Sequence, residues 1–202
     1  MEIGLNDAYS LKSPEDNKKL YAKWAATYES DFVANQGYHH PKVISDLFHN
    51  ELPQITNVLD IGTGTGLVGK FLSELRPNIV IDGIDISPEM LAEAKKKNVY
   101  RNLYERDLTK PVSGTEAPYD ALITIGTFTH GHLGIEVLEN LFPLVKGDGY
   151  FVIAVNEKYF HEHNFLEYLL ARKVKIVHMD KVHVYDQESE HRDSMNVVMI
   201  FQ

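Results

Sequence analysis

The chain has 202 residues, of which 44% are hydrophobic, so it is long enough for one well-formed core and short for two, and we expect a single domain. Its 20 Lys and Arg residues against 29 Asp and Glu residues give a net charge of −9, which supplies no net positive field to attract a nucleic acid. The absence of cysteine excludes disulfides, thiolate zinc sites and cysteine nucleophiles, and the lack of a leader-like N-terminus or of an apolar run of about 18 residues predicts a soluble, cytoplasmic protein with no membrane partner.

The first predicted element is a helix that begins at Ser13, Pro14 and Asp16, which are typical of an N-cap, a first helical residue and an acidic capping partner. We expect it to run to about Asn35, because apolar and aromatic residues recur along it at intervals of three to four. The residues of this stripe are Leu20, Tyr21, Trp24, Ala25, Tyr28 and Phe32. A second helix is predicted over residues 41–52.

Short β-branched runs follow, and helical segments separate them, which is typical of a parallel sheet wrapped by helices. The runs are TNVLDI, NIVIDGID, RNLYERD, YDALITIG and YFVIAVNE. The tail has a different pattern: residues 173–186 and 194–202 are two candidate strands joined by the polar loop QESEHRD. We therefore predict that an antiparallel hairpin closes the sheet.

The segment VLDIGTGTGLVG, residues 58–69, places glycines at alternate positions directly after the first predicted strand. Residues without a Cβ at such a turn allow backbone amides to approach a ligand. The segment also contains GTGLVG, a literal match to the dinucleotide-binding pattern, so a nicotinamide or flavin cofactor is an alternative at this point. In either interpretation a carboxylate at the end of the second strand binds ribose hydroxyls, and Asp85 holds that position.

Around the glycine loop the chain resembles the class I S-adenosylmethionine-dependent methyltransferases, over about residues 20–155. LDIGTGTG resembles the first motif of that family, with Asp60 inside the strand, and IDGIDIS, ERDLTKP, YDALITIG and LVKGDGYFVIAVNE resemble the second to fifth in order. The resemblance implies S-adenosyl-L-methionine as the cofactor. It also implies a Rossmann-like α/β fold: a seven-stranded, mostly parallel sheet of order 3-2-1-4-5-7-6, with the last strand antiparallel and helices on both faces.

The same resemblance implies roles for individual residues in cofactor binding. The glycine loop would lie along the methionine part, Asp85 would bind both ribose hydroxyls, Ile86 and Leu108 would sandwich adenine, and Asp107 would accept from its amino group. An uncharged adenine does need apolar faces and one acceptor at its edge. The residues predicted to bind the cofactor are Tyr21, Trp24, Tyr28, Asp60, Gly62, Thr63, Gly64, Asp85, Ile86, Asp107 and Leu108.

More narrowly, YAKWAATYESDFVANQGYHHP, GTFTHGHL and AVNEKYF resemble the methyltransferase-like proteins named after the Williams-Beuren syndrome chromosome region. The resemblance suggests that the N-terminal helix folds over the cofactor with Tyr21, Trp24 and Tyr28; the alternative is that these rings are core packing. We expect one methyltransferase domain over residues 1–202, in which residues 1–52 form an N-terminal helical lid and residues 53–202 a Rossmann-like core.

The nature of the acceptor is narrowed by motifs that the sequence lacks. Methylation of cytosine at carbon 5 needs a cysteine nucleophile, and GTFTHGH stands where enzymes that methylate exocyclic amines carry an Asn- or Asp-Pro-Pro-aromatic element. No inserted cap domain follows the fifth strand, so we predict a methyltransferase that acts on an unidentified small molecule. The alternatives are methylation of a protein side chain, a non-catalytic domain that binds the cofactor and, with less support, an NAD-dependent reductase.

Histidines directly after the fourth strand are candidates for a general base, because the usual imidazole pKa of about 6.5 suits proton removal near neutrality. We assign His130, with His132 beside it, and a structural hydrogen-bonding role is the alternative. The pairs His39-His40, His130-x-His132 and His161-x-His163 invite a metal site, but no carboxylate-histidine spacing on one helical face supports it. We therefore expect no metal, and the sequence does not indicate an oligomeric state.

Overall fold

The centre of the molecule is one seven-stranded sheet in the order β3-β2-β1-β4-β5-β7-β6, as predicted. The computed structural model describes residues 7–8, 11 and 13–202. The strands are β1 (Asn57–Ile61), β2 (Val80–Asp85), β3 (Asn102–Glu105), β4 (Tyr119–Phe128), β5 (Val145–Asn156), β6 (Ile176–His183) and β7 (Met195–Phe201). The first five pair in parallel, whereas β7 is antiparallel to both of its neighbours, β5 and β6. The closing hairpin is thus confirmed.

Strand register sets which residues share a face of the sheet. Val58 pairs with Ile81 on one side and Ala121 on the other, and all three are buried against the same helical layer. Leu59 pairs with Leu122, and both enter the opposite layer. Because both faces are covered, the central strands are almost continuously apolar, as parallel strands generally are.

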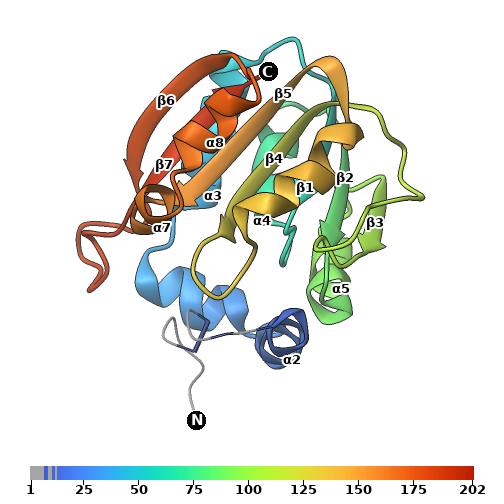
Figure 1. Ribbon diagram of the computed structural model, residues 1–202. Coiled ribbons are helices and arrows are strands. Elements are labelled where there is room, and N and C mark those ends of the chain that lie inside the picture. Colours follow the sequence, from blue (N-terminus) through green and yellow to red (C-terminus); the bar gives the residue numbers. More distant parts are fainter. Residues whose placement is uncertain (1–6, 9–10, 12) are drawn as a thin grey trace.

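Helices cover both faces of the sheet (Figure 1). The helices α3 (His40–Glu51) and α4 (Leu67–Leu75) pack on one face, through residues such as Phe48 and Leu72. On the other face lie α6 (Leu138–Leu141), flanked by short 3₁₀ turns at Ile135–Val137 and Phe142–Leu144, and α8 (Phe165–Ala171). The remaining helices are α2 (Pro14–Trp24), α5 (Pro88–Lys96) and α7 (Glu157–Glu162). No helix in the described part of the chain is long and apolar enough to cross a bilayer.

The N-terminal helix begins where the sequence predicts and ends earlier. Ser13 Oγ accepts a hydrogen bond from Asp16 N at 3.1 Å, with Pro14 in the first turn. The predicted helix to about Asn35 is interrupted after Trp24, and a π-helix follows at Tyr28–Ala34. The Trp24 ring centroid lies 5.1 Å from that of Tyr28 and 5.3 Å from that of Phe32. Packing of these rings against one another outweighs regular helical geometry here.

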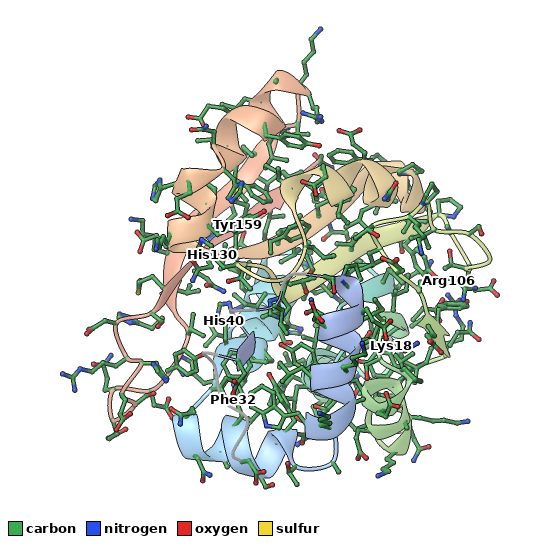
Figure 2. All side chains as sticks on the ribbon, turned by 60° about the horizontal axis from the view of Figure 1, so that its bottom comes forward. Lys18, Phe32, His40, Arg106, His130 and Tyr159 are labelled. Atoms are coloured by element: carbon green, nitrogen blue, oxygen red, sulfur yellow. The ribbon has the colours of Figure 1, made fainter. Side chains whose placement is uncertain are left out.

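Helix α2 and the π-helix lie beyond the carboxyl ends of the parallel strands (Figure 1). In the second view, α2, marked by Lys18, runs across the front of the molecule between the region of Arg106 and that of His130 (Figure 2). This end of a parallel α/β sheet is where ligands generally bind. The fold therefore brings the N-terminal helix over the place where a site is expected.

Candidate functional site

A cavity of about 500 Å³ lies between α2 and the carboxyl ends of the strands. Its walls come from the glycine loop after β1, the ends of β2, β4 and β5, the segment after β3, and α2 itself. All of the residues predicted to bind the cofactor line it, except Asp60. Those that line it are Tyr21, Trp24, Tyr28, Gly62, Thr63, Gly64, Asp85, Ile86, Asp107 and Leu108.

The glycine loop takes a backbone path that only glycine follows without strain. Gly62 and Gly64 have φ values of +68° and +56°, in the left-handed region. A Cβ on Gly62 would overlap Thr127 Oγ1, so β4 packs directly against the loop. The amides of Gly62 and Thr63 both donate to Ile84 O, at 2.9 and 3.0 Å, which holds the loop against the end of β2.

Asp85 ends β2 with its carboxylate fixed by two backbone amides. Gly64 N donates to Oδ2 at 2.8 Å, and Ser87 N donates to Oδ1 at 2.9 Å. Burial raises the pKa of Asp85 above its usual value, and the bonds from Ser87 and Gly64 offset this only in part. A carboxylate has about four acceptor positions, so each oxygen keeps one for a ligand after its amide bond. The group is therefore arranged to accept from two neighbouring hydroxyls.

The segment after β3 supplies an apolar face and an acidic loop. Leu108 is buried, its carbonyl accepting from Asn140 Nδ2 at 3.0 Å. Asp107 Oδ1 accepts from Thr109 N and Thr109 Oγ1, and its Oδ2 lies 3.0 Å from Lys110 Nζ. Partial burial raises the pKa of Asp107, but the bonds from Thr109 and Lys110 outweigh it and leave the pKa below its usual range. Asp107 is thus ionised and also shapes its own loop.

Asp60 lies beneath the glycine loop, not in the cavity wall, and this changes the expectation that it contacts the cofactor. Its Oδ2 accepts from the Tyr100 hydroxyl at 2.7 Å, and that hydroxyl accepts from Gly69 N at 3.1 Å. Burial raises the pKa of Asp60 to about 7, with the bond from Tyr100 acting in the opposite direction. Asp60 therefore anchors the start of α4, which positions the loop.

Tyr100 also explains the third glycine of GTGLVG. A Cβ on Gly69 would overlap the ring and hydroxyl of Tyr100. Gly69, within α4, is thus explained by the packing of Tyr100 against this helix, without reference to a dinucleotide. Sequence reasoning did not find Tyr100, because a lone tyrosine between α5 and β3 has no local signal of a partner in α4.

The two histidines after β4 point in different directions, His130 toward α7 and His132 toward α2. This geometry does not support the assignment of His130 as a general base in the cavity. His130 does not line the cavity, and its Nε2 lies 2.7 Å from Glu162 Oε2 on the neighbouring α7. His132 does line it, with Nε2 2.8 Å from the Tyr21 hydroxyl and Nδ1 3.2 Å from His130 O. The turn at Gly131, which has a φ of +78°, sends the two side chains in different directions.

Sequence reasoning also missed the wall beyond β4, β5 and β7. Thr129, Asn156 and Asn196 line the cavity there, together with Tyr38 and Tyr185, which form the isolated bridge between the N-terminal segment and the tail. These residues are far apart in the sequence and meet only in the folded sheet. In the part of the chain that the structure describes, no group of three or more His, Asp or Glu side chains is arranged to hold a metal ion.

Comparisons with known proteins give a domain match and several relatives. Residues 59–151 match the family model described as "Methyltransferase domain". The chain is 34% identical over 94 residues to a malonyl-[acyl-carrier protein] O-methyltransferase of Bacillus anthracis, covering 46% of this chain and 34% of that protein. It is 26% identical over 178 residues to malonyl-[acyl-carrier protein] O-methyltransferase 1 of Ilyobacter polytropus, covering 83% of this chain and 65% of that protein. The chain thus spans only part of the length of these relatives.

Solved structures with the same architecture cover nearly the whole chain. Magnesium protoporphyrin IX methyltransferase from Synechocystis PCC 6803, with bound cofactor, matches with a TM-score of 0.69 and 16% identity over 100% of both chains. The 1,6-didemethyltoxoflavin-N1-methyltransferase of Burkholderia thailandensis matches with a TM-score of 0.67 and 19% identity, over 95% of this chain and 90% of that one. The fold is that of the class I S-adenosylmethionine-dependent methyltransferases.

Proposed function

We propose, from a methyltransferase domain set in a class I methyltransferase fold, that the chain is an S-adenosyl-L-methionine-dependent methyltransferase acting on a small-molecule acceptor. The observation that carries the proposal is the carboxylate of Asp85, which Gly64 N and Ser87 N fix at the cavity wall. Two acceptor positions remain on it, one per oxygen, and a ribose offers two neighbouring hydroxyls.

The charges of the cavity wall favour this cofactor over a dinucleotide. Among the described lining residues, Arg106 is the only Lys or Arg, whereas Asp85, Asp107 and Glu136 supply carboxylates. The two phosphates of NAD would meet little positive charge there, whereas the sulfonium of S-adenosyl-L-methionine is itself a cation. This argues against the reductase alternative.

In this proposal each part of the cofactor has its own residues in the cavity wall. The glycine loop at Gly62–Gly64 would take the methionine part, and Asp85 the ribose. Ile86 and Leu108 would contact the adenine faces, and Asp107 would accept from its amino group through an oxygen that Lys110 also approaches. When bound, the cofactor supplies an electrophilic methyl group; the chain's part is to hold it in place and keep water away.

We further propose that α2 acts as a lid over the cavity. The predicted lid segment, residues 1–52, also includes α3, but α3 packs on the sheet and so belongs with the core at residues 53–202. Two contacts tie α2 to opposite sides of the cavity: Lys18 Nζ lies 2.5 Å from Glu105 Oε1, and Asn17 Nδ2 donates to Gly131 O at 2.9 Å. Trp24 is buried in a cluster with Phe32 and Tyr185, whereas Tyr21 and Tyr28 are only partly buried. The main contribution of Trp24 is therefore the packing that holds α2 against the rest of the protein.

A small acceptor is supported by the size of the site, because the cavity under α2 has a volume of about 500 Å³. We also propose the narrower likeness to the Williams-Beuren methyltransferase-like proteins, which rests on the segments at residues 21–41, 126–133 and 154–160.

Relatives that act on RNA also match: a ribosomal RNA small subunit methyltransferase C of Aliivibrio fischeri is 27% identical over 134 residues, covering 61% of this chain and 37% of that protein. The net charge of −9 argues against an RNA acceptor here.

The proposal is tested by thermal unfolding with added ligand, followed by a transfer assay. S-adenosyl-L-homocysteine at about one hundred times its Kd should add about 2.7 kcal/mol to the free energy of unfolding and raise Tm, and NAD should not. Radiolabel from the methyl donor should then enter a small-molecule fraction of a metabolite extract. Stabilisation by NAD alone, or label only in RNA or protein fractions, would overturn the proposal.

A further inference from the structure

The cavity has a second half that the cofactor assignments leave unused. The sheet order puts the ends of β1, β2 and β3, near the predicted cofactor residues, on one side and the ends of β4, β5 and β7 on the other. Thr129, Asn156 and Asn196 line the cavity on that other side, and none of them has a proposed cofactor role. This half is where an acceptor can lie.

These three side chains form a polar row across the adjacent ends of β4, β5 and β7. Asn156 is directly opposite Asn196 in the antiparallel pair of β5 and β7, and opposite residues point to the same face with Cβ atoms about 5 Å apart. Phe128 pairs with Val155 in the parallel pair of β4 and β5, so Thr129, which follows Phe128, lies beside Asn156. A ligand in this half thus meets a hydroxyl and two amides in a fixed order.

The cap of α7 decides which atom Asn156 presents to the cavity. Its Oδ1 accepts from Tyr159 N at 3.1 Å and so caps the first turn of that helix. The other end of the amide, Nδ2, carries two N–H groups and has no hydrogen-bond partner among the residues that the structure describes. Because Oδ1 is held by the cap, Asn156 presents a donor.

Asn196 presents the opposite atom, because His40 holds its nitrogen. Asn196 Nδ2 lies 2.9 Å from His40 Nε2, and since an amide nitrogen only donates, Nε2 accepts and the ring proton is on Nδ1. Burial lowers the pKa of His40 to about 3, so the ring is neutral and keeps the lone pair on Nε2. Asn196 is only 6% exposed, and its Oδ1 has no hydrogen-bond partner in the described part of the chain. Asn196 therefore presents an acceptor.

Thr129 adds a second donor at the other end of the polar row. Its side chain is only 7% exposed, and its Oγ1 has no hydrogen-bond partner among the described residues. Buried polar groups in native proteins almost always have a partner, so an unpartnered hydroxyl in a cavity wall points to a ligand. From β4 to β7 the polar row thus reads donor, donor, acceptor.

The charged groups of the cavity wall disfavour an anion in this half. Among the described lining residues the carboxylates are Asp85, Asp107 and Glu136, and Arg106 is the only Lys or Arg. Glu136 follows β4, whereas Arg106 follows β3 on the cofactor side. A carboxylate bound at the polar row would face Asn196 Oδ1, another acceptor, and would gain no cation for its lost water. A neutral group that both accepts and donates fits the row.

We propose that the methyl acceptor is a neutral molecule with an amide edge, either a primary carboxamide or a lactam, and that this edge binds across Thr129, Asn156 and Asn196. The inference rests on the proposed function and names the substrate class of the same site. The amide oxygen accepts from Thr129 Oγ1 and Asn156 Nδ2, and the amide N–H donates to Asn196 Oδ1. The rings of Tyr38 and Tyr185, with centroids 5.6 Å apart, line the same half and supply apolar contacts for the rest of the molecule.

Three small molecules of nearly the same shape test the amide edge. Benzamide offers an acceptor and a donor, benzoate offers two acceptors, and benzamidine offers two donors. Each is titrated, followed by protein NMR, into protein saturated with S-adenosyl-L-homocysteine, whose own binding is first measured by calorimetry. Concentrations reach about 10 mM, because molecules of this size bind with millimolar affinity. We expect benzamide to bind about tenfold more tightly than the other two, since each of these leaves a buried polar group unpaired.

Asn156→Asp should reverse this preference. Aspartate keeps the cap of α7 through one carboxylate oxygen and replaces the Nδ2 donor with an acceptor. Benzamide should bind about tenfold more weakly to the variant, and benzamidine more tightly than to wild type. Asn78→Asp is the matched control, because it adds the same charge at an exposed position between α4 and β2, at the other end of the sheet. It should leave all three affinities unchanged.

Two further measurements address the ends of the polar row. Thr129→Val should weaken benzamide binding about tenfold, yet leave the stability of the ligand-free protein unchanged or raised, because Oγ1 has no partner among the described residues. Nitrogen NMR reads the tautomer of His40, which the Asn196 amide alone sets, since Nδ1 contacts no other polar group of the described chain. We expect the proton on Nδ1. If Asn156→Asp does not fold, these two measurements decide.

The inference is overturned, and the proposed function left intact, if S-adenosyl-L-homocysteine binds but benzamide does not, or if benzoate or benzamidine binds wild type as tightly as benzamide. An unchanged preference in Asn156→Asp overturns it as well. So does a proton on His40 Nε2, because the Asn196 amide would then turn its nitrogen to the cavity. If S-adenosyl-L-homocysteine itself does not bind, the proposed function fails, and this inference fails with it.

Discussion

Gly64 donates its backbone N–H to the Asp85 carboxylate at 2.8 Å, so the loop after β1 and the end of β2 are joined at the cavity wall. The glycine therefore does more than leave space for a ligand. It sets the direction in which the carboxylate presents its remaining acceptor positions, and a ligand meets a group that is already oriented.

Replacing Asp85 with Ala should weaken the binding of S-adenosyl-L-homocysteine by about 2 to 4 kcal/mol. The reason is the loss of two hydrogen bonds to a charged acceptor, each worth about 1.5 to 3 kcal/mol and partly replaced by water. Calorimetry measures the change. Asp46→Ala is the control, since that carboxylate is on the surface of α3 beside Lys42. Equal affinities for Asp85→Ala and wild type would place the ribose elsewhere.

Asp60→Asn should change how stability depends on pH. The Asp60 pKa is raised from 3.8 to about 7, mainly by burial, so the folded protein binds the proton more tightly than the unfolded chain. This contribution to stability is fully present below about pH 4 and is lost as the pH rises to about 7. Asparagine keeps the bond from Tyr100 and does not titrate.

The free energy of unfolding of wild type relative to Asp60→Asn should therefore fall between about pH 4 and 7, by at most about 4 kcal/mol, and level off above. Urea unfolding at several pH values measures the difference, and the variant removes the contribution of all other titrating groups. A difference that is constant with pH would mean that Asp60 titrates normally.

Gly69→Ala should destabilise the fold by about 1 to 3 kcal/mol, because the added methyl group overlaps the Tyr100 ring and hydroxyl in a packed layer. Gly147→Ala is the matched control, since a Cβ there would meet no atom within 4 Å. Chemical unfolding compares the two variants. If both behave alike, Tyr100 can move aside, and its packing does not require a glycine at position 69.

Hydrogen exchange should report the lid. A segment that gains contacts only when a ligand is bound opens less often afterwards, so amides between Tyr21 and Tyr28 should exchange more slowly with S-adenosyl-L-homocysteine present. Amides of β6, at Ile176–His183, serve as the internal reference. Trp24 fluorescence should change in the same titration. If the amides of residues 21–28 are already fully protected from exchange without ligand, the aromatic rings of this segment belong to the core and not to a lid.

The sheet and the position of Asp85 could be predicted because both depend on local patterns. Apolar runs of strand length mark the sheet, and a carboxylate directly after such a run lies at its carboxyl edge. The resemblance of the motifs supplied the strand order, which the structure confirms.

Other features depend on contacts between distant segments and could not be predicted. The interruption of the first helix follows from packing among Trp24, Tyr28 and Phe32, which helical periodicity alone does not reveal. Asp60 and Tyr100 meet across 40 residues of sequence. His130 and His132 have nearly the same local sequence, and only the turn at Gly131 decides which of them faces the cavity.

Helix α2 contacts Glu105 at one side of the cavity and Gly131 at the other, so undocking of the whole helix would open both sides together. The cofactor and the acceptor would then both enter and leave through the same motion, the undocking of α2. Release of the methylated product and of the spent cofactor would have the same rate limit, set by the undocking of α2. Acceptors of very different affinity would then show similar turnover numbers.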